Sequence, residues 1–90
     1  MRLDLFLKAS RIAPRRTVAQ ELCDAGAVSV NGAAARSSRA VREGDEITVR
    51  RRASVLTVRV LTVPQTKQLS RADAPSLYEV VSDVRVNDEL

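Results

Sequence analysis

The spacing of the apolar residues changes at Gly26, and this change constrains the fold more than any other feature of the chain. Over residues 3–7 the apolar positions recur at i, i+3 and i+4, which is the pattern of one helix face. From residue 28 onward they alternate with a period of two, which is the pattern of a strand with one buried face. The sequence therefore predicts an α+β fold in which helices come first and strands follow.

Two short helices are expected before Gly26. The first ends near Ser10, and a tight link that contains Arg11 leads into the second. Pro14 suits the first turn of the second helix, where its missing N–H group costs nothing. Gly26 adopts the left-handed backbone conformation easily and is expected to end that helix.

Turn residues divide the β part into short antiparallel strands. Asn31-Gly32 is the strongest hairpin signal of the chain, because both residues tolerate the positive φ angles of a type I′ turn. Glu43-Gly44-Asp45 marks a second turn. The expected elements are a strand at 28–30, a return at 33–36 as either a strand or an irregular edge, a strand at 47–49, a connection at 50–54 and the longest strand at 55–63.

Pro64 ends the regular pattern, so we expect one domain at residues 1–63 and a linker with a C-terminal tail at residues 64–90. Residues 77–81 are compatible with a helical turn or with a short strand, and their spacing does not decide between the two. Residues 82–90 are expected to fray, as unanchored termini usually do. The C-terminal segment is thus predicted to be loosely packed.

Basic residues are concentrated in the first part of the chain. Residues 1–52 contain eleven Lys or Arg against six Asp or Glu, whereas residues 53–90 contain four against five. The whole chain carries a formal charge of +4, which favours a polyanionic partner. The aromatic residues are Phe6 and Tyr78, and so small a number disfavours single-strand binding by base stacking.

Cys23 is the single cysteine, so an internal disulfide is excluded and a reducing cytoplasm is the expected compartment. We expect its thiol to be buried as a small apolar group. The N-terminus is too polar for a signal peptide, and no apolar run approaches the roughly 20 residues that span a bilayer. A soluble protein without a membrane partner is therefore expected.

The densest basic cluster lies in residues 1–16, where Asp4 is the only acidic residue. The cations of this cluster are Arg2, Lys8, Arg11, Arg15 and Arg16. Cations this dense on two short helices are typical of a surface that binds phosphates. The arginine fork suits this role because it grips a phosphate with two parallel hydrogen bonds. The alternative interpretation of such a run is a solvated helix face.

Arg2 and Arg16 are the strongest candidates for RNA contact. Arg2 begins the first helix beside the Arg15-Arg16 corner, and Arg16 flanks the apolar face of the second helix. Arg15 points nearer that apolar face, so its stem is equally suited to packing. Asp4 is expected to pair with an arginine and to fix its orientation rather than to touch phosphate.

Further candidates lie outside the helices. The turn at Asn31 either donates backbone N–H groups to RNA or is no more than a hairpin corner. Arg36, Arg39 and Arg42 fit RNA contacts and solubility charges equally well. The basic run at residues 50–52 is either an additional phosphate contact or a solvated turn.

A series of positions at fixed spacing across residues 1–60 resembles the S-four RNA-binding domain. They are Arg2, Leu3, Asp4, Phe6, Leu7, Ser10, Arg11, Arg16, Ala19, Leu22, Gly26, Val28, Val30, Asn31, Gly32, Gly44, Asp45, Ile47 and Val49. The resemblance implies an S-four-like fold with an αL motif, in which two short helices pack on a small, mostly antiparallel sheet. The residues expected to contact RNA are Arg2, Lys8, Ser10, Arg11, Arg15, Arg16 and Asn31, with Asp4 as the residue that orients them.

The start of the chain, at residues 1–17, is similar to the RqcP (YabO) family of stand-alone S-four domains. This resemblance implies binding to rRNA of the large ribosomal subunit and to peptidyl-tRNA when a stalled nascent chain remains attached. It also implies support of alanine tailing by an RqcH-like protein in ribosome-associated quality control. The chain departs from the family pattern at Pro14, where a basic residue is expected, and in its heavier basic run at residues 50–52. We expect a monomer that needs no cofactor.

Catalysis is disfavoured because the chain has no histidine, no nucleotide-binding glycine motif and no Cys/His set for zinc. Two other functions remain open. One is a protein-interaction module whose basic charge is incidental. The other is a ribosome recycling factor resembling heat-shock protein fifteen, for which a longer basic C-terminal extension is expected.

Overall fold

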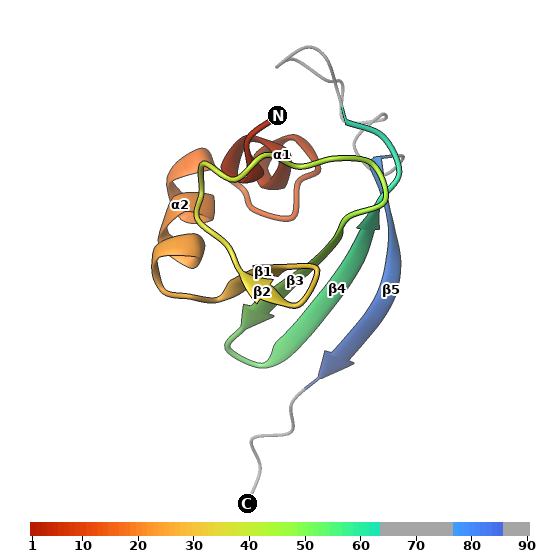
Figure 1. Cartoon of the computed structure of the whole chain (residues 1–90). Helices are drawn as coiled ribbons and strands as arrows, with labels where there is room; N and C mark the ends of the chain where they lie inside the picture. The colour runs from red at the N-terminus through yellow and green to blue at the C-terminus, as the bar shows by residue number, and fades with distance from the viewer. Residues whose placement is uncertain (64–76, 86–90) are drawn as a thin grey trace, which may run out of the picture.

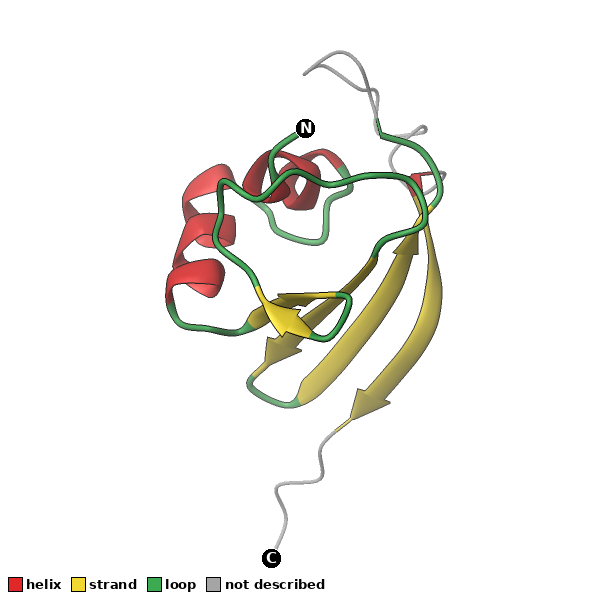
Figure 2. Cartoon of the chain, in the orientation of Figure 1, coloured by secondary structure: helices red, strands yellow, loops and turns green. Residues whose placement is uncertain are grey.

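Two short helices pack on one face of a five-stranded antiparallel sheet in this computed structural model, which describes residues 1–63 and 77–85 (Figures 1 and 2). The elements are α1 (Leu3–Ala9), α2 (Arg16–Asp24), β1 (Val28–Val30), β2 (Ala33–Ala34), β3 (Glu46–Arg51), β4 (Ser54–Val60) and β5 (Tyr78–Arg85). The strand order is β2-β1-β3-β4-β5. The predicted α+β architecture is confirmed. No helix of the described ranges is long and apolar enough to cross a membrane.

The core lies between the helices and the inner face of the sheet. The inner-face residues of the three central strands are each at most 1% exposed, and they are Val28, Val30, Ile47, Val49, Val58 and Val60. From α1, Leu3, Phe6 and Leu7 enter the same core and are fully buried. Burial of one such side chain contributes about 1.5–3 kcal/mol. This layer therefore fixes the position of α1 on the sheet.

The link between the helices is longer than predicted, because α2 begins at Arg16 and not at Pro14. Ile12 and Ala13 of the link are buried in the core. Arg15, which follows Pro14, is extended, with φ −143° and ψ 155°, and so interrupts the chain before the helix. The chain thus turns inward to bury its two apolar link residues before a helix can start.

Tight turns set the register of the sheet. Asn31 and Gly32 have φ angles of 52° and 85°, so the predicted type I′ hairpin is confirmed. The return after this turn is a short strand, β2, and not an irregular edge. β3 and β4 pair as far as Arg51 and Ser54, so their connection is shorter than the predicted residues 50–54.

β5 pairs with β4 along its length and forms one edge of the sheet. The structure thus selects the strand alternative for residues 77–81, apart from Leu77, which precedes the strand and is buried. The prediction that residues 82–90 fray is wrong for residues 82–85, because cross-strand hydrogen bonding holds them in the ladder. A bulge in this pairing interrupts the alternation that marks a strand in sequence. The predicted linker and the last residues, 64–76 and 86–90, lie outside the described residues.

Candidate nucleic-acid interface

Asp4 lies in the first turn of α1 and is fully buried, although it carries a carboxylate. Its Oδ1 accepts a hydrogen bond from the backbone N–H of Leu5 at 2.8 Å. Its Oδ2 accepts from the side-chain amide of Gln20 at 3.0 Å and from Nε of Arg16 at 3.2 Å. Nε of Arg2 lies 3.2 Å from Oδ1 and completes the set. We call Arg2, Asp4, Arg16 and Gln20 the Asp4 cluster.

The two arginines of the Asp4 cluster contact the buried carboxylate on one side and are exposed to solvent on the other. Their side chains remain 44% exposed for Arg2 and 42% exposed for Arg16, while Asp4 has no exposed surface. A guanidinium carries five N–H donors in a rigid fork, so the contacts with Asp4 leave donors of both residues facing solvent. The structure thus contains the predicted pairing of Asp4 with arginine. Contact of these arginines with RNA stays a prediction.

Three local features of the chain bring the Asp4 cluster together. Arg2 precedes α1 in an extended conformation, so its side chain stands beside the first turn that carries Asp4. Arg16 opens α2, and Gln20 lies one turn later on the same helix face. Because α1 packs against α2, that face meets Asp4. Gln20 is the member that sequence reasoning missed, and its only signal is the i, i+4 spacing from Arg16.

The contacts of Asp4 lower its pKa. Burial alone raises the pKa of this carboxyl, because it disfavours the charged form. The hydrogen bonds from Gln20, Arg16 and the Leu5 N–H, together with the charge of Arg2, outweigh that effect. The pKa of Asp4 therefore lies below the ordinary value for aspartate, and the carboxylate stays ionised at neutral pH.

Acidification is expected to destabilise the native state through Asp4. A carboxyl whose pKa is lower in the folded than in the unfolded chain contributes stability above the unfolded value of about 4. That contribution is lost as pH falls through the folded pKa. Urea unfolding at pH 7, 5 and 3 should show a steeper loss of stability for the natural chain than for Asp4→Asn. If the free energy of unfolding fell equally with pH in the two proteins, Asp4 would not be the source of the acid sensitivity.

The loop between β2 and β3 brings further arginines to the start of α1. The N–H of Leu3 donates to the Arg39 carbonyl at 2.8 Å, and the N–H of Asp4 donates to the Ser37 carbonyl at 3.1 Å. These bonds satisfy N–H groups of the first turn of α1, which has no side-chain cap. Arg36 and Arg39 are exposed in this loop. Their backbones therefore lie at the same end of α1 as the Asp4 cluster, and a role for them in binding stays open.

The remaining cations of the N-terminal basic cluster lie around the link. Lys8 is exposed on α1, and Arg11 follows that helix with a φ of 66°. Arg15 is exposed and lies in the extended residue before α2. All three side chains are accessible to a partner, and their contact with RNA stays a prediction.

Ser10 and Asn31 do not present free side chains to a partner. Ser10 is 2% exposed, and its hydroxyl donates to the Leu7 carbonyl at 3.2 Å, so it closes the end of α1. We correct the expectation that Ser10 contacts RNA. Asn31 donates from Nδ2 to Asp45 at 3.1 Å, and its Oδ1 accepts from the N–H of Glu46 at 2.9 Å. The backbone N–H of Asn31 donates to the Glu46 carbonyl at 2.7 Å, so it is already paired within the sheet, and contact of this turn with RNA stays a prediction.

Cys23 is 7% exposed and belongs to the core, as predicted. Burial raises the pKa of its thiol, and the charges of Asp4 and Asp24 add to that effect. A thiol with a raised pKa is a poor nucleophile at neutral pH. Within residues 1–63 and 77–85, no group of three or more His, Cys, Asp or Glu is placed to hold a metal ion.

Known proteins resemble this chain in sequence and in fold. Residues 1–47 match the S4 (S-four) domain family. The chain is 44% identical over 80 residues to the RQC P-site tRNA stabilizing factor of Halalkalibacterium halodurans, with 89% of each protein covered. It is 40% identical over 90 residues to the RQC P-site tRNA stabilizing factor of Streptococcus pneumoniae, with 100% of each covered. The trimeric structure of Vibrio cholerae Heat Shock Protein 15 superposes with a TM-score of 0.81 at 28% identity, covering 91% of this chain and 82% of that one.

Proposed function

Because this chain belongs to the S4 domain family and to the family of the RQC P-site tRNA stabilizing factors, we propose that it is a non-catalytic protein that stabilises tRNA on the ribosome. On this proposal it binds rRNA and peptidyl-tRNA on a large subunit that carries a stalled nascent chain. It acts as a cytoplasmic monomer without a cofactor. In ribosome-associated quality control it supports alanine tailing by an RqcH-like protein.

The Asp4 cluster is the observation that carries this proposal. Arg2, just before α1, and Arg16, at the start of α2, converge on one buried carboxylate, and each keeps over two-fifths of its side chain exposed. Asp4 restricts the rotamers of both forks, so less conformational entropy is lost when they bind phosphate. Folded RNA presents phosphates and 2′-hydroxyls in a fixed geometry, and proteins recognise it mainly by shape. A preformed pair of arginine forks suits that kind of recognition.

The salt dependence of binding tests the proposal. If about five phosphates are neutralised, the logarithm of the affinity should fall with the logarithm of salt concentration at a slope of about −3.5 to −4.5. Filter binding or co-sedimentation with purified large subunits, across a series of KCl concentrations, measures this slope. Subunits that carry P-site tRNA should bind more tightly than vacant ones. A slope near zero would instead favour the protein-interaction module, whose basic charge is incidental.

A further inference from the structure

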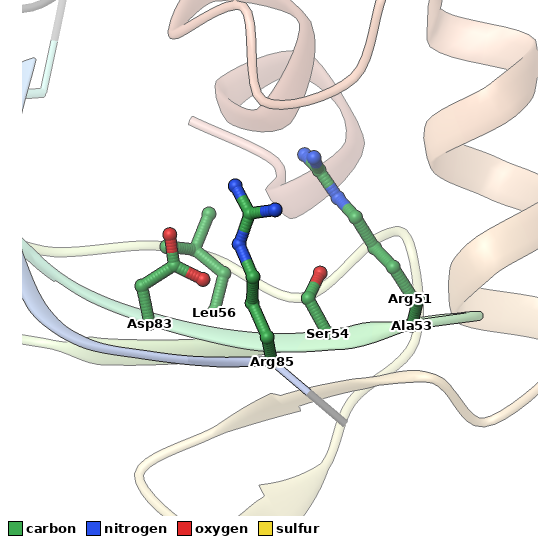
Figure 3. A pocket seen from close by; sticks show the side chains of 6 residues that line it. All are labelled: Arg51, Ala53, Ser54, Leu56, Asp83 and Arg85. Carbon is green, nitrogen blue, oxygen red and sulfur yellow. The ribbon is translucent and has the colours of Figure 1, made fainter. Parts of the chain in front are cut away.

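A hollow of about 290 Å³ opens on the inner face of the sheet, and no member of the Asp4 cluster lines it (Figure 3). It lies where β3, β4 and β5 reach the β3–β4 turn. Its lining residues are Arg51, Ala53, Ser54, Leu56, Asp83 and Arg85. Figure 3 shows the side chains of Arg51 and Arg85 rising from the sheet on the same side, with Ser54 between them.

The register of the sheet builds the floor of this hollow. Ser54 of β4 pairs with Arg51 of β3 on one side and with Arg85 of β5 on the other. Directly opposed residues point to the same face, and neighbouring strands lie about 4.8 Å apart. The backbones of the two arginines therefore lie about 10 Å apart, with Ser54 between them. This spacing leaves room for a group that both forks can reach.

Arg51 is fixed in place by the link between the helices. Its Nη2 donates to the Ile12 carbonyl at 2.6 Å, across the space between β3 and the helical layer. That contact occupies one of the five N–H donors of the guanidinium. The side chain is thus oriented by one bond while it remains exposed. Such a fork binds with a smaller loss of rotamer freedom than a fully mobile one.

We propose that this hollow binds a backbone phosphate of the RNA held by the Asp4 cluster, which gives the protein a second RNA contact. The inference rests on the proposed function. Two guanidinium forks and a hydroxyl donor match the oxygens of a phosphodiester. Asp83 pairs with Leu56 on the next position of the same face and also lines the hollow. Its carboxylate repels an anion from that side. The phosphate therefore sits over Ser54, between Arg51 and Arg85.

Inorganic phosphate is the simplest probe of this site. In ¹H–¹⁵N spectra of the full chain at constant ionic strength, replacing chloride with phosphate should shift the Ser54 amide and the Arg51 and Arg85 Nε–H signals saturably. Arg85→Gln and Arg51→Gln should each weaken this binding about tenfold, the loss expected for a charge-assisted hydrogen bond. Asp83→Asn should strengthen it. Shifts that do not saturate, or that persist unchanged in Arg85→Gln, would overturn the site.

Arg50 supplies a matched control. It precedes Arg51 on β3, so strand alternation places it on the opposite face of the sheet, where it pairs with Val55. Arg50→Gln removes the same charge and should leave the phosphate shifts unchanged. Equal losses in the Arg50 and Arg51 variants would show a general charge effect and would contradict a specific site.

Binding to large subunits that carry tRNA tests the RNA part of the proposal separately. Arg85→Gln should lower that affinity about tenfold and reduce the salt slope by about 1, whereas Arg50→Gln should have a smaller effect. If variants of the Asp4 cluster lose subunit binding while Arg85→Gln binds like the natural chain, the proposed function stands and the second contact is wrong. Stronger competition at the hollow by a poly-glutamate peptide than by tRNA would indicate an acidic protein partner and would also overturn it.

Discussion

Replacing Arg16 with glutamate is expected to abolish co-sedimentation with large ribosomal subunits at physiological salt. The change removes a half-exposed guanidinium that Asp4 holds in position and places a negative charge where a phosphate is expected. Loss of a hydrogen bond to a charged group costs about 1.5–3 kcal/mol, or roughly 10–100-fold in affinity, before the new repulsion is counted. Pelleting through a sucrose cushion, with the protein fraction quantified in pellet and supernatant, measures the effect.

Two variants separate binding from folding in this experiment. Arg50→Glu makes the same charge change on the outer face of β3 and should still co-sediment. Arg2→Ala combined with Arg16→Ala adds no negative charge beside Asp4, so it tests the loss of both forks without a new repulsion. Circular dichroism should show that these proteins keep the native helix and sheet signal. If the double alanine variant still pellets with the subunits, the Asp4 cluster is not the RNA-binding surface.

The helices and the hairpin could be predicted from sequence because their signals are local. Asn31-Gly32 needs only its own φ angles to define the β1–β2 turn, and the alternation in β4 needs only its own residues. The start of α2 could not be predicted in the same way. It depends on the burial of Ile12 and Ala13, which is a property of the packed core.

The residues of the candidate site also differ in whether a local signal could identify them. Arg2, Asp4 and Arg16 were identified because cations cluster in sequence around one acid. Gln20 was missed because its contact with Asp4 exists only when α2 lies against α1. The proximity of Arg51 to Arg85 required the register of three strands, and the sequence left β5 undecided between a short strand and a helical turn. Long-range pairing, more than local propensity, thus determines what the sequence leaves undecided.

Replacing Asp4 with alanine is expected to cause a large loss of stability for the change of a single polar side chain. The substitution leaves the Gln20 amide without its acceptor and places the Arg2 and Arg16 guanidinium groups together without a counter-charge. Breaking a buried ion pair costs about 3–5 kcal/mol, but both arginines are half exposed and solvent screens them, so we expect about 2–3 kcal/mol. For a domain of this size, that lowers Tm by about 10–20 °C.

Asp24→Asn is the charge-matched control for Asp4. Asp24 is exposed at the end of α2, where the helix dipole disfavours a negative charge. Removal of this charge should therefore leave the free energy of unfolding unchanged or raise it slightly. Urea unfolding of both variants gives the comparison. Asp4→Asn, which keeps the shape and one acceptor oxygen, should lose less stability than Asp4→Ala yet still weaken subunit binding, because its amide cannot hold both forks. If Asp4→Ala were as stable as the natural chain, the carboxylate would not be what organises the two arginines.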